Sequence, residues 1–308
     1  MSVIVFGPTG NVGSFAARTA HQHGAKVVLA MRDTSKSIPG LAMDDEKRGG
    51  FERVTADLTK PDTVAAAVKQ SGAKRAFIYL AHQAQDHMKA TIEALKTSGI
   101  ELVVFLSSYT VTRFGSLDVP KEEIIPWLHA EVEKNLETTF GSKGYVALRP
   151  GAFATNAAGW WRQMIRAGEV QMFAPQLKFD WTAAEDMGGV AGVILAQGPK
   201  NGEKIVHIFG PNYISQQQAF EIVQKEALNK PVKLTIIDNP ELNTKNMQSL
   251  APGPIAKYLT DKMVARSKES DELEFPNLKE GQDNVQKYTG RPAVTFEQYV
   301  KGNKADFE

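Results

Sequence analysis

The sequence MSVIVFGPTGNVG, residues 1–13, decides the fold that we predict for this chain. Residues 3–6 (VIVF) form a short apolar run, which is typical of a buried parallel strand. Three glycines follow at intervals of three residues, and residues 11–23 then show the apolar periodicity of a helix. The sequence therefore predicts a strand, a glycine-rich turn and a helix in direct succession.

Each glycine of this turn is expected to have a separate task. Gly7 lets the strand turn sharply, Gly10 lets the backbone approach a pyrophosphate, and Gly13 lets the helix pack close to the strand. The amides and the dipole at the helix N-terminus favour a phosphate there. The alternative is an ordinary tight turn, but its position straight after an apolar strand favours a dinucleotide site. The predicted cofactor contacts in this turn are Gly7, Thr9, Gly10, Asn11, Val12 and Gly13.

The composition excludes several classes of protein. The 308 residues carry a formal net charge of +1, which argues against a nucleic-acid or membrane-surface partner. The chain has no cysteine, so disulfides, thiolate nucleophiles and thiolate metal sites are excluded, and the six histidines lack ligand spacing, so we predict no metal. No run approaches the roughly 18 apolar residues that span a membrane, and the N-terminus lacks the features of a signal peptide. We therefore expect a cytoplasmic location.

Apolar strands alternate with amphipathic helices up to residue 150, which predicts an α/β fold with a doubly wound parallel sheet, a Rossmann domain. The expected strands are 26–31, 51–57, 75–81, 101–106 and 145–148, and the expected helices are 61–71, 85–98 and 126–140. The character of the sequence changes after Gly151, and the helices expected there are 184–197, 215–228, 240–270, 283–288 and 295–302, with strands at 204–209 and 232–237. We predict an NADP(H)-binding domain over residues 1–151. A smaller, mostly helical substrate-binding or cap region is expected over 152–308, with some of its elements completing the Rossmann unit.

The choice of cofactor rests on the residue that follows the second strand. Ligands of doubly wound sheets lie beyond the carboxyl ends of the strands, and NAD-binding domains usually carry an acid at this point. Here the residue is Arg32. A guanidinium suits a 2′-phosphate through charge-assisted hydrogen bonds, which predicts NADP(H) rather than NAD(H). Lys36 is a second candidate for the same phosphate, and the alternative for Arg32 is a solvated surface side chain.

Further cofactor contacts are expected where the next strands end. Asp57 and Leu58 follow the third strand, where an adenine ring would lie. Ala81 and His82 follow the fourth strand, although a hydrogen-bonded surface histidine is the simpler interpretation of His82. Ser107 follows the fifth strand.

An aromatic segment after Gly151 is the candidate substrate site. Phe153, Trp160 and Trp161 lie in a stretch that otherwise contains many small residues. Aromatic pairs on a helix usually belong to a core. The alternative is the wall of a pocket, which would indicate a bulky, flat and apolar substrate.

Several longer motifs extend along nearly the whole chain. They are GPTGNVG at 7–13, AMR at 30–32, ADLTKPDTV at 56–64, FLSS at 105–108, HAEVEK at 129–134, LRPGAF at 148–153, WTAAEDMGGVA at 181–191 and YTGRPAVTFEQYV at 288–300. With these motifs the chain resembles the NmrA-like family of atypical short-chain dehydrogenases, and in particular its fungal secondary-metabolism members. The resemblance implies NADP(H) binding. It also implies one of three roles: reduction of C=C or C=N bonds in aromatic or alkaloid substrates, a cyclisation step, or regulation by sensing the nicotinamide pool.

The chain departs from the reductases of this family at the proton donor. His129 stands where reductase-type relatives carry a lysine, and histidine can donate a proton near neutral pH. Tyr109 follows the fifth strand and is a second candidate acid and a candidate substrate contact. The alternative for His129 is that the proton donor has been lost. A Tyr-x-x-x-Lys pattern at Tyr258 and Lys262 lies far past the cofactor domain, and we regard it as a chance match.

These observations predict an NADP(H)-dependent oxidoreductase. The hydride would pass to or from a C=C or iminium C=N bond of a hydrophobic aromatic or alkaloid-type metabolite, with cyclisation as an optional coupled step. The alternative is a non-enzymatic NADP(H) sensor of the NmrA type, and only this alternative requires a protein partner. It accounts for the absent lysine equally well, but less well for the aromatic segment. The sequence leaves the substrate, the direction of hydride transfer and the oligomeric state open.

Overall fold

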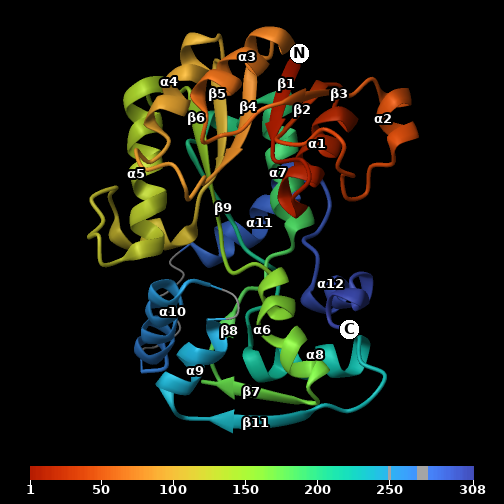
Figure 1. The fold of residues 1–308 in the computed structure, drawn as a ribbon, viewed down its shortest axis with the longest axis vertical. Helices are drawn as coiled ribbons and strands as arrows, with labels where there is room; N and C mark the ends of the chain where they lie inside the picture. The colour runs from red at the N-terminus through yellow and green to blue at the C-terminus, as the bar shows by residue number, and fades with distance from the viewer. Residues whose placement is uncertain (249–250, 269–276) are drawn as a thin grey trace. The chain divides into compact units, whose positions relative to one another are not determined.

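The computed structural model of the chain describes residues 1–248, 251–268 and 277–308 (Figure 1). It divides into two compact units. Unit 1 comprises Met1–Pro150, Ala184–Ile208 and Glu280–Pro292, and unit 2 comprises Gly151–Ala183, Phe209–Lys279 and Ala293–Glu308. The first boundary lies one residue before the predicted one, and two later segments of the chain return to unit 1.

A seven-stranded parallel sheet forms the centre of unit 1 in the described residues, with the order β3-β2-β1-β4-β5-β6-β9. Its strands are β1 (Ser2–Phe6), β2 (Lys26–Met31), β3 (Glu52–Thr55), β4 (Arg75–Tyr79), β5 (Leu102–Leu106), β6 (Tyr145–Pro150) and β9 (Ile205–Ile208). The strand order reverses direction between β1 and β4, and ligands of such sheets bind beyond the carboxyl ends of the strands at this point. The predicted Rossmann-type α/β fold is confirmed.

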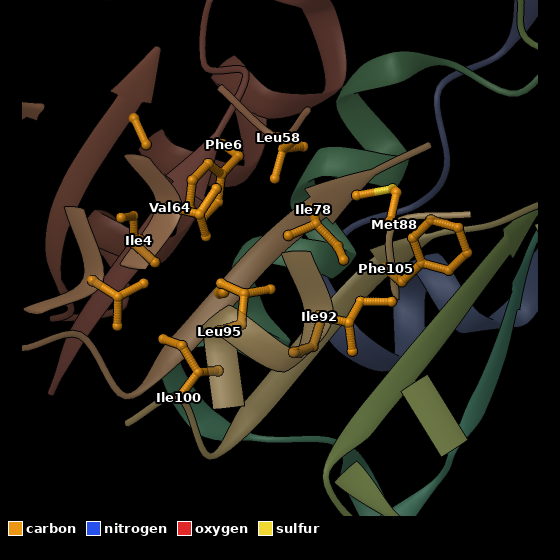
Figure 2. Packing of buried hydrophobic residues seen from close by; sticks show 14 of the residues in the cluster. Ile4, Phe6, Leu58, Val64, Ile78, Met88, Ile92, Leu95, Ile100 and Phe105 are labelled. Atoms are coloured by element: carbon orange, nitrogen blue, oxygen red, sulfur yellow. The ribbon is translucent and has the colours of Figure 1, made fainter. Parts of the chain in front are cut away.

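Both faces of this sheet are buried under helices. The helices of unit 1 are α1 (Asn11–Gln22), α2 (Met43–Gly49), α3 (Pro61–Ser71), α4 (Lys89–Thr97), α5 (Ile124–Phe140), α7 (Ala184–Gln197) and most of α11 (Leu278–Thr289), with short 3₁₀ turns η1 (Tyr109–Phe114) and η2 (Lys200–Gly202). Figure 2 shows one face, where Ile4 and Ile78 of the strands pack with Val64 of α3 and Leu95 of α4. Side chains alternate along a strand, so Val3 faces the other way, and α1 and α7 contact the strands there.

Close contacts attach the two returning segments to unit 1. A Cβ atom on Gly192 of α7 would lie 2.7 Å from the carbonyl oxygen of Ala16 in α1, which is too close for any other residue. Two residues after α11, Arg291 Nη1 donates a hydrogen bond to Oδ1 of the fully buried Asp186 of α7 at 2.7 Å. Asn284 Nδ2 donates to the carbonyl oxygen of His207 at 2.9 Å. These contacts connect α7, α11 and β9 into one body.

Unit 2 combines helices with two small sheets. Its elements are α6 (Thr155–Arg166), β7 (Glu169–Phe173), β8 (Lys178–Phe179), β10 (Ile214–Ser215), α8 (Gln216–Glu226), β11 (Lys233–Ile237), α9 (Pro240–Met247), α10 (Gly253–Arg266), α12 (Phe296–Gly302) and η4 (Lys304–Asp306). Strand β7 pairs in parallel with β11, and β8 pairs antiparallel with β10. The core is aromatic. The ring centroid of Trp181 lies 4.9 Å from that of Phe296 and 5.9 Å from that of Trp161.

Several predicted boundaries were wrong. The helix expected over 85–98 begins only at Lys89, and the one expected over 126–140 begins at Ile124, with Pro126 in its first turn. Helix α2 and strands β7, β8 and β10 were not predicted. The helical segment expected over 240–270 contains α9 and α10, while 249, 250, 269 and 270 lie outside the described residues.

Candidate functional site

The turn between β1 and α1 forms an open cradle of backbone amides. Gly7 has φ = +70°, in the left-handed region that favours glycine, and its amide donates to the carbonyl oxygen of Ala30 at 3.0 Å. A Cβ atom on Gly13 would collide with the carbonyl oxygen of Gly7, so the helix starts directly on the turn. Gly10 is the exposed N-cap residue of α1, and as a glycine it offers no side chain to accept hydrogen bonds from the first amides of the helix. The helix N-terminus therefore remains open to an anion.

The other predicted residues of this turn differ in their exposure. Asn11 is exposed and Thr9 is partly buried, so both lie where a ligand in the cradle can reach them. Val12 is 7% exposed and packs below the turn, which leaves its backbone amide as the group that a phosphate can contact.

A cation, a carboxylate and an aromatic ring gather at the carboxyl ends of the neighbouring strands. Arg32 follows β2 and is exposed, and its charge acts on both Asp57, after β3, and Tyr79, at the end of β4. Burial opposes the ionised form of Asp57, but hydrogen bonds from the amide and hydroxyl of Thr59 and the charges of Arg32 and Lys60 together outweigh it, so the pKa of Asp57 is lowered. Leu58 packs its side chain into the core (Figure 2).

Tyr79 is a site residue that the sequence analysis missed. Its side chain is 38% exposed and its ring lies against Gly7, 2.5 Å from where a Cβ atom on that glycine would be. Burial raises the pKa of Tyr79, so the ring borders the cradle as a neutral phenol. The only signal in the sequence is a large polar aromatic residue at the carboxyl end of a strand.

An ion pair that the sequence did not reveal fixes the loop after Arg32. Glu46 of α2 is 5% exposed, and its Oε1 accepts a hydrogen bond from Arg53 Nη2 at 2.5 Å. The same guanidinium donates through Nη1 to the carbonyl oxygen of Lys36 at 2.9 Å. The side chain of Lys36 remains exposed, on the same loop as Arg32.

A buried polar network lies at the carboxyl ends of β5 and β6. Ser107 Oγ, after β5, donates to Glu133 Oε1 of α5 at 2.5 Å. Arg149 of β6 holds the same carboxylate with Nε and Nη2, at 3.1 and 2.7 Å. Glu133 is 1% and Arg149 6% exposed, so the pair is desolvated. Loss of either partner would leave the other as an unpaired buried charge.

The network continues into η1 and β9. Arg149 Nη1 donates to Thr112 Oγ1 at 3.1 Å, and Thr112 Oγ1 lies 2.8 Å from His207 Nε2. Burial lowers the pKa of His207, which favours its neutral form. The sequence analysis did not include Glu133, Arg149, Thr112 or His207. Glu133 does follow His129 by one helical turn in HAEVEK, and Arg149 ends a strand in LRPG.

His129 is held in one tautomer. Its Nδ1 lies 2.8 Å from the carbonyl oxygen of Ile125, which can only accept, so Nδ1 carries the proton. Burial lowers the pKa of His129, although its main-chain bond and the charge of Glu133 oppose this. The neutral ring therefore presents an unprotonated Nε2, and His129 donates a proton from this atom only after it has been protonated there.

The remaining predicted residues near this end lie on loops. His82 is exposed and Ala81 partly buried, just after β4, and the backbone amide of Ala81 donates to Met88 Sδ at 3.3 Å. Tyr109 is partly buried and begins η1, directly after Ser108. These positions place all three at the carboxyl edge of the sheet in unit 1.

The predicted substrate residues occupy different environments within unit 2. Trp161 is 2% exposed and packs on Phe220 at 5.4 Å between ring centroids, so it belongs to the core. Trp160 is partly buried and its ring lies 5.4 Å from that of Phe179. Phe153 is partly buried and forms an isolated bridge with Thr182. Both tryptophans also line a pocket within unit 2, which holds about 390 Å³ of empty space, part of it open to solvent.

Other kinds of site were sought in the part of the chain that the structure describes. There, no group of three or more His, Cys, Asp or Glu side chains is placed to hold a metal ion. No helix in the same residues has the length and apolar character needed to cross a membrane. Tyr258 and Lys262 both lie on α10 in unit 2, with the ammonium 5.4 Å from the centre of the ring.

The reversing strand order and the open glycine turn define a Rossmann-type α/β protein. The chain belongs to the NmrA-like family, whose model matches residues 1–288. The nitrogen metabolite regulation-like protein bik4 of Gibberella fujikuroi is 35% identical and covers 97% of this chain and 95% of that protein. The NAD(P)H azoreductase of Xenophilus azovorans is 25% identical over 99% of each chain. The resemblance found in the motifs is confirmed.

Solved structures share the whole fold. The NADPH-dependent quinone oxidoreductase of Escherichia coli, complexed with NADPH, superposes with a TM-score of 0.73. It covers 98% of this chain and 99% of that chain, at 18% sequence identity. At this identity the likeness establishes the fold and not the activity.

Proposed function

We propose that the protein is an NADP(H)-dependent oxidoreductase that acts on a hydrophobic aromatic or alkaloid-type small molecule. The observation that carries the proposal is the open glycine cradle with Arg32 beside it. The azoreductase relative and the NADPH-bound quinone oxidoreductase of the same fold support it. The hydride would pass to or from a C=C or C=N bond.

The residues of unit 1 fit the cofactor group by group. The amides around Gly10 would bind the pyrophosphate, and Arg32 with Lys36 would bind the 2′-phosphate. Asp57 would contact the adenosine, together with the main chain of Leu58, whose side chain lies in the core. Ala81, His82 and Ser107 are the proposed contacts at the nicotinamide end. The nicotinamide, when bound, supplies or accepts the hydride.

Proton transfer is assigned to His129 and Tyr109. For reduction, His129 must first take up a proton at Nε2, because its neutral ring has the proton on Nδ1. Tyr109 offers a phenol at the carboxyl edge of the same sheet. An iminium substrate already carries a positive charge, so its reduction needs no strong acid. This fits the absence of a lysine at position 129.

The aromatic side chains of unit 2 support an aromatic substrate. Phe153 and Trp160 are only partly buried, so they retain surface for a flat ring, whereas Trp161 is 2% exposed and would contact a ligand only through the pocket. The pocket is lined mainly by aromatic and thioether groups, together with four carboxamides, which favours an aromatic ligand that also carries a polar group.

The second candidate function is a non-enzymatic NADP(H) sensor that binds a protein partner. The relative at 35% identity, which is a nitrogen metabolite regulation-like protein, favours it, as does the histidine at position 129. The unit 2 pocket favours the enzyme, because a sensor needs no substrate site.

The two functions are separated by NADPH oxidation, followed by absorbance, with a panel of quinones, azo dyes, cyclic enones and iminium compounds. We expect turnover with at least one acceptor, and faster with NADPH than with NADH. Tight binding of NADPH without turnover on any acceptor would contradict the enzyme and support the sensor.

A further inference from the structure

We infer that the pocket in unit 2 binds a planar aromatic ligand that donates a hydrogen bond, and that the carboxamide oxygen of Gln216 is its acceptor. The pocket lies among α6, β7, α9, α10 and the first residue of α8, and every residue that lines it belongs to unit 2. The pocket and the open solvent at its mouth together hold about 390 Å³ of empty space.

Most walls of this pocket are aromatic and thioether side chains, and the carboxamides of Gln171, Gln216, Asn243 and Asn246 complete the lining. Trp160 and Trp161 contribute indole rings, and Met164, Met247 and Met263 contribute sulfur atoms and flexible stems. Thioethers are polarisable and adapt their shape to a ring, and their contacts with aromatic groups are favourable. The walls therefore fit a flat conjugated ring better than a branched aliphatic group.

The polar group that gives the pocket its selectivity is Gln216, which is 3% exposed. Its Nε2 donates to the carbonyl oxygens of Phe173 and Ala174, both at 2.9 Å. Both amide hydrogens are thereby used and the orientation of the carboxamide is fixed. Oε1 makes no hydrogen bond to the described residues and is not among the polar atoms sealed from solvent. Gln216 lines the pocket, so we infer that this oxygen is the acceptor available there.

A second acceptor lies on α9. Asn243 is 7% exposed, and its Nδ2 donates to Thr260 Oγ1 at 3.0 Å. Its Oδ1 makes no hydrogen bond within the described ranges 1–248, 251–268 and 277–308. Carboxamide oxygens only accept, so an occupant must bring an O–H or N–H group. A site built to hydrogen-bond such a group discriminates against the analogue that lacks it.

The inference deepens the proposed function. It rests on that function only in identifying the ligand of the pocket with the substrate of hydride transfer. Binding itself requires unit 2 alone. It is therefore measured by calorimetry on the full chain without a cofactor, which keeps a failure of the pocket distinct from a failure of NADPH oxidation.

The test compares indole with 1-methylindole. The two rings are equally flat, but only indole carries an N–H donor. We expect indole to bind about 5-fold or more tightly than 1-methylindole, the effect of one hydrogen bond to an otherwise unpaired acceptor. Equal affinities, or no binding of indole, would overturn the proposal.

A matched pair of variants places the binding in this pocket. Met164→Trp fills the pocket and is expected to weaken indole binding at least about 10-fold. Ile236→Trp adds the same side chain on β11, at a position that is 52% exposed and does not line the pocket, and should bind indole as the wild type does. Unchanged binding in a folded Met164→Trp, or equal loss in both variants, would contradict the assignment. If Met164→Trp does not fold, the indole pair alone decides.

Discussion

At the scale of single residues, Arg32 has the clearest consequence, because it is the cation beside the glycine cradle. Arg32→Ala is expected to weaken NADPH binding about 10- to 100-fold, the loss of a charge-assisted hydrogen bond to the 2′-phosphate. NADH binding should stay the same, since NADH has no such phosphate. Isothermal titration with both cofactors measures this.

Arg48→Ala is the control for that substitution. Its side chain is 75% exposed and pairs with Asp45 on α2, so removing it changes the net charge of unit 1 by the same amount. It should leave both affinities unchanged. An equal loss of affinity for NADPH and NADH in Arg32→Ala would show that Arg32 does not bind the 2′-phosphate.

The pH dependence of turnover tests His129. Burial lowers its pKa below the ordinary 6.5, so its protonated fraction grows as the pH falls toward that lowered pKa. If His129 gives the proton, the rate of reduction rises as the pH is lowered from 8 to 6. His129→Ala should then lower the rate about 100-fold and flatten the profile.

Tyr109→Phe is the companion variant, because it removes only the hydroxyl. Full turnover in both His129→Ala and Tyr109→Phe would refute both assignments. A flat pH profile in the wild type, with a loss in Tyr109→Phe alone, would transfer the role to the phenol.

The glycine turn and Arg32 could be predicted from the sequence, because a glycine triplet and an arginine directly after a strand are local signals. Sequence reasoning did not find the contacts of Glu133 with Ser107 and Arg149, because these residues come from three elements and 26 positions separate Ser107 from Glu133. Nor did it find Tyr79, whose importance depends on the approach of its ring to Gly7 across the sheet.

At the scale of elements, the packing of α7 on α1 depends on glycine. In Gly192→Ala the new methyl group would meet the Ala16 carbonyl oxygen at 2.7 Å and the Ala20 nitrogen at 2.8 Å, and backbone atoms cannot move aside cheaply. We expect a loss of about 1–3 kcal/mol in the free energy of unfolding, measured with urea. Gly302→Ala, at the end of α12 and without neighbours within 4 Å, should cost little or stabilise.

In unit 2, Asp180 connects three segments. The fully buried carboxylate accepts hydrogen bonds from the amides of Ala152 and Gly210 and from the hydroxyl of Thr182. Asp180→Ala would remove the acceptor of the Ala152 amide and of the Thr182 hydroxyl, while the Gly210 amide keeps its second acceptor, Thr182 Oγ1. The substitution should cost at least about 2 kcal/mol in the free energy of unfolding. Asp118→Ala, at a side chain that is 91% exposed, is the control and should cost less than about 0.5 kcal/mol.

The same variant has a defined pH dependence. Burial raises the pKa of Asp180 to about 6, so the folded state holds this proton more tightly than the unfolded state. Its contribution to stability is therefore largest below about pH 4 and is lost as the pH rises through 6. The difference in the free energy of unfolding between wild type and Asp180→Ala should shrink as the pH rises from about 4.5 to about 7.5. A difference that grows over this range would contradict the assignment.

Element prediction succeeded where the apolar period is long and failed where tertiary contacts decide. The parallel strands and α1, α3 and α5 follow from such periods. Helix α4 begins at Lys89, later than predicted, because the fully buried Met88 adopts φ = +63°. This left-handed conformation prevents the helix from extending to residues before Lys89. Strands β8 and β10 are two residues long, and such short segments have no period to detect.

At the scale of the whole molecule, the two units interleave in the sequence. Asp186 and Arg291 meet inside unit 1 although 105 positions separate them. No local pattern predicts such a contact, so the sequence indicated a two-part chain but not which later segments return. Family membership, by contrast, was visible in motifs spread over the whole length, and the match over residues 1–288 confirmed it.

The central claim, that the protein is an NADP(H)-dependent oxidoreductase, is tested most directly by a single-turnover measurement in the direction of reduction. Protein loaded with an equimolar amount of NADPH is mixed with the best acceptor of the panel without oxygen, and the NADPH absorbance is followed. The account predicts complete loss of the signal from the wild type and a much slower loss from His129→Ala. A signal that persists in the wild type while NADPH stays bound would contradict the claim.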